Sequence, residues 1–222
     1  NSNNFLDKKV KEYFTFDQRY QYVYEIMKAV KVLTFGIFNF HQMPEHQFMG
    51  KKLNFSHAFD GKTKLFEFND EENNKGESFL SKNNINKEKF ICFIVRTSEY
   101  NKIYGTPEQS RRENTVMKFR NIDNPKAYIP SLEYLANSGY SIIRMGKGFS
   151  NPFPYTHSNF FDYAISDDRS DFLDIWLSTN CSFFFGTAAG IITLPSMFNT
   201  PYLGTNSFPL GTIYSYLPKS VH

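Results

Sequence analysis

A turn rich in cations and glycine follows the apolar run at residues 140–143. Residues 144–148 read Arg-Met-Gly-Lys-Gly, which places two positive charges on a backbone that a ligand can approach closely. Arginine offers a planar fork of N–H donors to phosphate oxygens, and lysine adds a point charge. The pattern therefore predicts a phosphate-binding turn. The alternative is that Arg144 pairs with a nearby carboxylate, such as Asp167 or Asp168.

A run of small residues follows a second apolar run, residues 182–185. Residues 186–190 read Gly-Thr-Ala-Ala-Gly and lead into an apolar helical pattern. A strand that passes through small residues into a helix leaves backbone N–H groups and the positive end of the helix dipole facing outward, where an anion can approach. This turn is therefore a second candidate for phosphate binding. The alternative is that its small side chains only allow the strand to pack closely against the helix.

Arginine also ends the first apolar run of this half of the chain, residues 91–95. Arg96 follows that run directly, and Arg120 and Asp123 lie just before the next helical pattern. Three arginines at successive strand and loop ends are more than solubility requires. We therefore expect Arg96, Arg120 and Arg144 to lie on one edge of a sheet.

The elements that must position these residues alternate between short apolar runs and helical patterns. Continuous apolar runs are typical of parallel strands with helices on both faces of the sheet. The alternation predicts an α/β fold with a doubly wound, mostly parallel, Rossmann-like sheet, in which ligands bind at the carboxyl ends of the strands. The expected strands are residues 91–95, 140–143, 160–165, 182–185 and 201–203.

The helices between these strands have recognisable beginnings. Asn124 can cap a helix whose first turn accepts Pro125, and Asp168 or Ser170 can cap the next one. Pro195 should kink or restart the helix that follows the run of small residues.

The first part of the chain is less regular. Residues 1 to about 35 have helical spacing, a short helix should end near Asn83, and residues 82–89 form the expected boundary. We expect a partial, mainly helical N-terminal region at 1–85 and a Rossmann-like domain at 86–222, truncated at its C-terminus. The polar loop at 97–123 is long enough to be functional.

Composition excludes several classes of function. The formal charge is only +3 over 222 residues, and no run of basic residues indicates nucleic-acid binding. No stretch reaches the about 18 apolar residues of a membrane span. Cys92 and Cys181, the only cysteines, lie at apolar runs, which is typical of buried free thiols rather than metal ligands. The chain shows no signal peptide and lacks an initiator Met, so we expect a fragment.

Several short motifs occur in a fixed order along the second half of the chain. They are Arg96, Arg120-Asn121-Ile122-Asp123, Tyr134-Leu135, Gly139-Tyr140, Ile143-Arg144-Met145-Gly146, Asp174-Ile175, and Phe184-Phe185-Gly186-Thr187 with Gly190. In this order they resemble a family of bacterial glycosyltransferases with GT-B architecture, over about residues 64–210. More distantly, Arg96-x-x-Glu99 is similar to the Arg-x-x-Asp of fucosyltransferase-like enzymes.

The resemblance implies the C-terminal half of a GT-B fold, with residues 86–222 binding a nucleotide sugar. It implies sugar transfer from that donor to a glycan acceptor, without a metal or other cofactor, since arginines and helix N-termini can stabilise the departing nucleoside diphosphate. Arg96 and Glu99 would be catalytic, with His41, His46 or His57 as alternatives to Glu99 as general base. The residues implied to bind the donor are Arg96, Arg120, Asp123, Arg144, Gly146, Lys147, Asp174, Gly186, Thr187, Ala188, Ala189 and Gly190.

Two turns depart from the family pattern. The family's His-Val-Arg-Asp reads Ile94-Val95-Arg96-Thr97 here, and its Gly-Thr-Ser-Ser-Gly reads Gly-Thr-Ala-Ala-Gly at 186–190. Two alternatives therefore stand beside the transferase: a non-catalytic nucleotide-sugar-binding module and a GT-B-fold nucleotide-sugar epimerase.

The resemblance also predicts where the protein acts and what it meets. We expect surface polysaccharide synthesis in the cytoplasm, compatible with peripheral association at the inner face of the membrane. The expected partners are the nucleotide-sugar donor and a glycan acceptor, and not nucleic acid. His157, on a Pro-rich loop, is a further candidate for a substrate contact.

Overall fold

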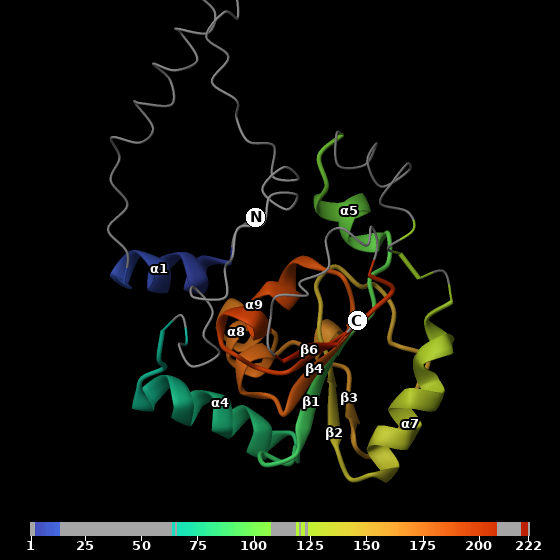
Figure 1. Ribbon diagram of the computed structural model, residues 1–222, viewed down its shortest axis with the longest axis horizontal. Coiled ribbons are helices and arrows are strands. Elements are labelled where there is room, and N and C mark those ends of the chain that lie inside the picture. The colour runs from blue at the N-terminus through green and yellow to red at the C-terminus, as the bar shows by residue number, and fades with distance from the viewer. Residues whose placement is uncertain are drawn as a thin grey trace, which may run out of the picture.

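The computed structural model describes residues 3–13, 64, 66–107, 119, 121–122, 124–207 and 219–221. These residues form an α/β fold around one parallel sheet (Figure 1). His41, His46, His57, Arg120 and Asp123 lie outside the described residues, so their predicted roles stay predictions.

Six strands pair in the order β3-β2-β1-β4-β5-β6, and every pair is parallel. The Rossmann fold has this strand order. The predicted parallel α/β sheet is therefore confirmed. The strands are β1 (Phe90–Ile94), β2 (Ser141–Arg144), β3 (Phe160–Phe161), β4 (Phe183–Thr187), β5 (Tyr202–Thr205) and β6 (Ser220–Val221).

Helices surround this sheet and connect its strands. The α-helices are α1 (Asn4–Tyr13), α4 (Asp70–Lys82), α5 (Glu99–Tyr104), α7 (Ile129–Asn137), α8 (Asp171–Asn180) and α9 (Thr193–Met197). Short 3₁₀ helices also occur in the described residues. They are η3 (Pro125–Tyr128) directly before α7, η4 (Tyr163–Ile165) between β3 and α8, and η5 (Gly190–Ile192) directly before α9.

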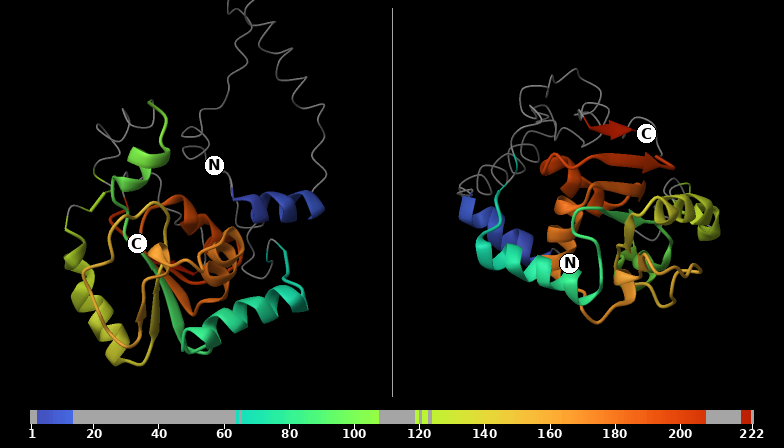
Figure 2. Two further views of the ribbon diagram at one scale, coloured as in Figure 1. Left: turned by 180° about the vertical axis from the view of Figure 1, so that it is seen from behind. Right: turned by 90° about the horizontal axis from the view of Figure 1, so that it is seen from below.

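The helices cover both faces of the sheet, as double winding requires. Side chains of β1 alternate between the faces. Cys92 and Ile94 pack in one core with residues of α4 and α8, whereas Phe93 and Val95 pack in another with residues of α7. Figures 1 and 2 show α7 on one side of the strands and α4 with α8 on the other. Both faces of β1 are buried, which explains its continuous apolar sequence.

The helix predicted to end near Asn83 begins earlier than the sequence pattern suggested. A capping box fixes its start, because the Asn69 side chain accepts from Glu72 N while the Glu72 carboxylate accepts from Asn69 N. The helix reaches Lys82 and packs on α8, where a side chain at Gly76 would collide with the indole of Trp176. The predicted end of the helix is confirmed.

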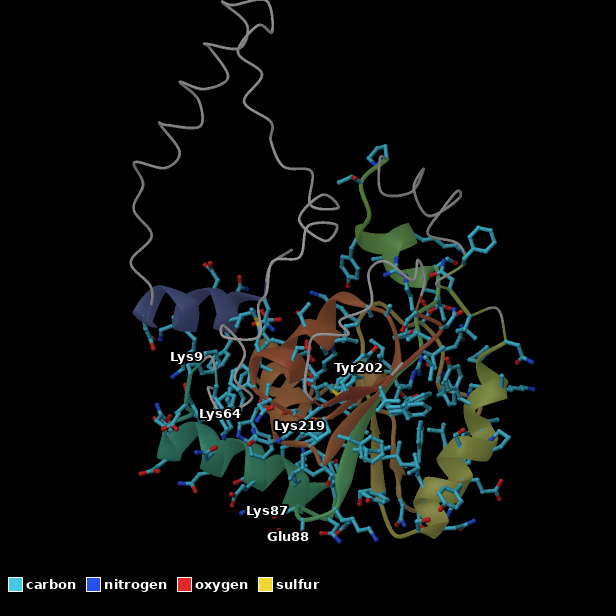
Figure 3. The ribbon with its side chains drawn as sticks, in the orientation of Figure 1. Lys9, Lys64, Lys87, Glu88, Tyr202 and Lys219 are labelled. Carbon is cyan, nitrogen blue, oxygen red and sulfur yellow. The ribbon has the colours of Figure 1, made fainter. Side chains whose placement is uncertain are left out.

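The described part of the predicted N-terminal region packs on the sheet domain. Lys9 of α1 pairs with Glu72 of α4 at 2.8 Å and lies between the two helices (Figure 3). At the other end of α1, Asn4 N donates to the Asp171 carboxylate at the start of α8. Residues before 86 and residues of the sheet therefore share the core on the α8 face.

The predicted strand at 160–165 is wrong beyond Phe161. β3 contains only Phe160 and Phe161, and the chain then turns into η4. Asp162 causes the break, because its carboxylate accepts hydrogen bonds from Arg144 and from the backbone N of Phe153. Arg144 is the last residue of β2, so these bonds hold Asp162 beside the end of that strand, at the point where the chain leaves the sheet.

Two predicted helix starts are confirmed. The Asn124 side chain accepts from Lys126 N, and Pro125 begins η3, which leads into α7. Ser170, rather than Asp168, caps α8 by accepting from Leu173 N at 3.2 Å. Among the described residues, no helix is long and apolar enough to cross a membrane.

Candidate functional site

The sheet changes its direction of winding between β1 and β4, which are neighbours in space but not in sequence. In parallel sheets this switch point is where ligands bind, just outside the carboxyl ends of the two strands. Arg96 follows β1, and Thr187 is the last residue of β4. Two of the predicted site residues therefore meet where the topology places a ligand.

A hydrogen bond joins these two residues. The backbone N of Arg96 donates to Thr187 Oγ1 at 2.6 Å, and Thr187 is fully buried. The Arg96 guanidinium is held from the other side, since Nε donates to Asn121 Oδ1 at 3.1 Å. Ile122 N also donates to the Arg96 carbonyl at 2.9 Å. The side chain is thereby fixed while remaining partly exposed.

The segment around residue 121 closes this end of the sheet on the α7 face. Tyr128 of η3 hydrogen-bonds Thr205 at the end of β5, with 2.8 Å between the two hydroxyl oxygens. Burial raises the pKa of Tyr128, so it stays a neutral hydroxyl. Asn206 Nδ2 donates to the Phe119 carbonyl at 3.0 Å. Phe119, Ile122 and Tyr128 thus contact the segments that follow β1 and end β5.

The two glycines of the turn at 186–190 differ in the space around them. Gly186 has φ of 142°, and a side chain there would collide with the Ile94 carbonyl of the neighbouring strand. Ala188 is buried, so it packs in the core rather than facing a ligand. Gly190 is different, because a side chain at that position would meet no atom within 4 Å. Ala189 lies between them as the residue that precedes η5.

The helix dipole predicted behind this turn is small. Gly190 begins a 3₁₀ turn of three residues, and α9 adds only five more, with Pro195 inside it. α9 begins at Thr193, before Pro195, so the helix does not restart at Pro195, and no long helix directs its axis at the turn. Any anion at this turn would depend on local N–H groups and on the cations around it.

Arg144 forms an internal ion pair, and its partner is neither Asp167 nor Asp168. Its Nη1 donates to both oxygens of Asp162, at 2.9 and 3.1 Å. The guanidinium carbon lies 4.0 Å from the ring centroid of Phe149 and 5.2 Å from that of Phe153. The side chain is only 5% exposed. The pairing alternative therefore describes Arg144 as it stands, while a phosphate contact by Arg144 remains a prediction.

Lys147 reaches across the carboxyl edge toward α5. Its Nζ lies 5.1 Å from the ring centroid of Tyr104, the last residue of α5. Gly148, with φ of 80°, packs against the same ring. The segment after β2 thus contacts the helix that follows β1, and Lys147 lies on the edge where it was predicted.

Arg169 is a cation of this edge that the sequence reading missed. Its Nε donates to the Gly146 carbonyl at 3.0 Å, and its Nη2 forms an ion pair with Asp174. Arg169 immediately precedes Ser170, the N-cap of α8. Its place between a strand and a helix cap is the signal that could have identified it.

Asp174 is a buried carboxylate with one unused oxygen. Its Oδ2 pairs with Arg169, whereas Oδ1 is buried and has no hydrogen-bond partner within the described part of the chain. Burial raises the pKa of Asp174 to about 6, against the lowering effect of Arg169. Burial also raises the pKa of Tyr163, whose hydroxyl exchanges hydrogen bonds with the Ser170 backbone.

Glu99 is the first residue of α5, three positions after Arg96. Its backbone N donates to Thr97 Oγ1 at 3.3 Å, which fixes the start of the helix. Its Oε2 is buried and, within the described residues, has no hydrogen-bond partner. Glu99 thus lies at the carboxyl edge of the sheet with an unsatisfied oxygen, and its role as general base stays a prediction.

His157 does not lie on this edge, contrary to expectation. Its Nδ1 accepts from Asn159 N, and the Asn159 side chain donates to the Ala136 carbonyl near the end of α7. Asn159 O also accepts from Ile142 N near the start of β2. These contacts place His157 at the amino edge of the sheet, the end where Figure 3 shows Lys87 and Glu88.

Neither metal ligands nor known relatives add to this site. In the ranges that the structure describes, no three His, Cys, Asp or Glu side chains cluster as metal ligands do. Cys92 and Cys181 are both buried free thiols, and burial raises the pKa of Cys92 well above its ordinary value.

Comparisons of the chain with protein-family models, curated proteins and solved structures find no match.

Proposed function

We propose that this protein binds a nucleotide-activated sugar at the carboxyl edge of β1 and β4 and transfers the sugar to a glycan acceptor. The observation that supports this most is the strand order, which reverses at β1 and β4 beside Arg96 and Thr187. Rossmann-like sheets bind nucleotides at this switch point. The sequence resemblance adds the GT-B architecture, the metal-independent reaction and a place in surface polysaccharide synthesis at the cytoplasmic side of the membrane.

The diphosphate of the donor would lie against Arg96 and the turn at 186–190. The arginine would stabilise the charge that develops on the departing nucleoside diphosphate, which needs no metal or other cofactor. Small side chains and the open position of Gly190 let phosphate oxygens approach backbone N–H groups. Lys147 would add positive charge from the segment after β2. Glu99, three residues after Arg96, would accept the proton of the attacking acceptor hydroxyl.

Donor binding is tested by calorimetric titration with GDP, UDP, CMP and ADP. We expect one of them to bind, and Arg96→Ala to weaken that binding about 10- to 150-fold, because charge-assisted hydrogen bonds contribute about 1.5–3 kcal/mol. Lys87→Ala is the matched control, since it removes one positive charge at the opposite edge (Figure 3). Binding of none of the four would sink the proposal.

A second candidate is a nucleotide-sugar-binding module without transferase activity. It is favoured by Ile94, which stands where the resembled family has histidine, because Ile94 lies in β1 with only 6% exposure. The isoleucine side chain has no titratable group to offer there. An assay with glycan acceptors separates the two candidates. If nucleoside diphosphate is released from the bound nucleotide sugar, and if this release depends on Glu99, the protein is a transferase.

A further inference from the structure

Two arginines near the end of β2 form buried ion pairs, and the two guanidinium groups differ in exposure and in what covers them. The side chain of Arg144 is 5% exposed and lies against two phenylalanine rings. The side chain of Arg169 is 19% exposed. A guanidinium has five N–H donors, and two of those of Arg169 are used by Gly146 and Asp174. Within the described residues, the structure records no acceptor for the other three.

These two bonds hold Arg169 in a defined direction. The Gly146 carbonyl fixes Nε, and Asp174 fixes Nη2, so both ends of the planar group are anchored. Anchoring reduces the entropy that a flexible arginine loses when it binds an anion. Asp174 is itself rigid, because it belongs to α8 and is 9% exposed.

Asp174 uses only one of its two carboxylate oxygens to bind Arg169. In the other pair, Asp162 uses both oxygens for Arg144 and adds a bond from Phe153 N. Asp174 presents only Oδ2 to Arg169 and leaves Oδ1 without a partner within the described chain. The Asp162 carboxylate therefore uses both of its oxygens, whereas the Asp174 carboxylate does not.

Arg169 lies on the edge of the candidate site. Gly146, which it contacts, follows β2 and the residue Met145, whose N donates to Phe93 of β1 at 2.7 Å. Arg169 thus extends over the carboxyl end of the sheet from the α8 face. Arg96, held by Asn121 and Ile122, belongs to the same edge at the end of β1.

We propose that Arg169 is a phosphate-binding residue of this site and that Asp174 is its positioning residue. The inference rests on the proposed nucleotide site and deepens it, because it gives the diphosphate a second arginine. It replaces the direct ligand contact predicted for Asp174 by an indirect one, since a carboxylate repels phosphate and an anchored guanidinium attracts it. Arg144 keeps Asp162 and the loop after β2 in place.

The test measures the affinity of the full chain for inorganic pyrophosphate and for the nucleoside diphosphate that binds best. We expect Arg169→Ala to weaken both at least tenfold, and Arg169→Lys to recover part of the loss because it keeps the charge without the fork. The inference is overturned if Arg169→Ala binds both probes as the wild type does. If Arg169→Ala does not fold, the affinity of Arg169→Lys is compared with that of the wild type instead, after thermal melting has shown that Arg169→Lys is folded.

Asp174 is tested by two substitutions that separate positioning from folding. Asp174→Ala removes the anchor, so we expect a severalfold loss of pyrophosphate affinity. Asp174→Asn keeps an oxygen for Arg169 and should restore most of that loss. If the two variants have equal melting curves and both bind pyrophosphate as tightly as the wild type, the positioning role is contradicted.

The outcomes distinguish this inference from the proposed function. If a nucleoside diphosphate binds but Arg169→Ala has no effect, the inference fails and the nucleotide site stands. If pyrophosphate binds in an Arg169-dependent way but no nucleotide does, the anion site stands and the proposed function fails. Absence of binding of both probes to the wild type overturns both.

Discussion

The two arginine–aspartate pairs near the end of β2 are chemically alike but structurally opposite. Arg144 and Asp162 make a closed pair, with both carboxylate oxygens used and aromatic rings over the guanidinium. Arg169 and Asp174 make an open pair, with one unsatisfied oxygen and a more exposed guanidinium. The first connects β2 to β3, whereas the second faces the edge where a ligand is expected. Two arginines near the same strand end can therefore have different environments, and their partners and exposure distinguish them.

Arg144→Ala should have the largest effect on stability. The substitution leaves Asp162 buried without its counter-charge and removes the cation from two aromatic rings. Breaking a buried pair from one side costs about 3–5 kcal/mol. Urea denaturation should therefore show a loss of that size in the free energy of unfolding. A loss below about 1 kcal/mol would mean that the closed pair does not hold the loop after β2.

Asp174 should make stability depend on pH. Its pKa is raised to about 6 in the folded protein by burial, although Arg169 and Tyr163 lower it and Asp171 adds to the increase. Between about pH 4 and pH 6 the folded state binds a proton that the unfolded chain releases, so the free energy of unfolding falls as the pH rises through this window. The total decrease should be about 3 kcal/mol.

Asp174→Asn provides the control for this dependence. The amide cannot titrate, so the difference in unfolding free energy between wild type and variant should change with pH by the amount given above. Urea denaturation at several pH values measures it. A difference that stays constant from pH 4 to pH 7 would show that burial does not raise the pKa of Asp174.

Arg169→Ala should cost less stability than Arg144→Ala. Asp174 can take up a proton near pH 6 when its partner is removed, which limits the penalty for an unpaired buried charge. We expect a loss of about 1–2 kcal/mol at pH 5.5, from the bonds to Gly146 and Asp174. Losses of equal size for the two arginine variants would remove the distinction between a closed and an open pair.

Thr187→Val should have the smallest effect on stability. It keeps the volume of a fully buried side chain but removes the acceptor for Arg96 N. One net hydrogen bond contributes about 1 kcal/mol, and the same change should reduce nucleotide affinity because it loosens Arg96. Wild-type stability and affinity of Thr187→Val would indicate that this contact does not organise the switch point.

The sequence predicted the central strands well because β1, β2 and β4 are almost completely buried, whereas β6 at the edge was not predicted. β1 and β4 are continuous apolar runs, and the caps at Asn124 and Ser170 identify the helices between strands. The early start of α4 was also readable, since Asn69 and Glu72 have the spacing of a capping box. Local patterns of this kind need no knowledge of the tertiary structure.

The partners of the arginines could not be predicted in the same way. Asp162 follows Arg144 by 18 residues, and Arg169 follows Gly146 by 23. Which carboxylate or carbonyl each arginine reaches depends on the path of the loop after β2, which has no periodic pattern. The same loop returns His157 to the amino edge. The sequence therefore placed Arg96 and the turn at 186–190 at the carboxyl edge of the sheet but did not identify Arg169 or the partners of the arginines.

The most direct test of the central claim is the affinity of the protein for nucleoside diphosphates with and without Arg96. Calorimetric titration should detect binding of one of GDP, UDP, CMP or ADP by the wild type and by Lys87→Ala, with a loss of about 10- to 150-fold in Arg96→Ala. If the wild type binds none of them, or if Arg96→Ala binds as tightly as Lys87→Ala, the ends of β1 and β4 do not form a nucleotide site.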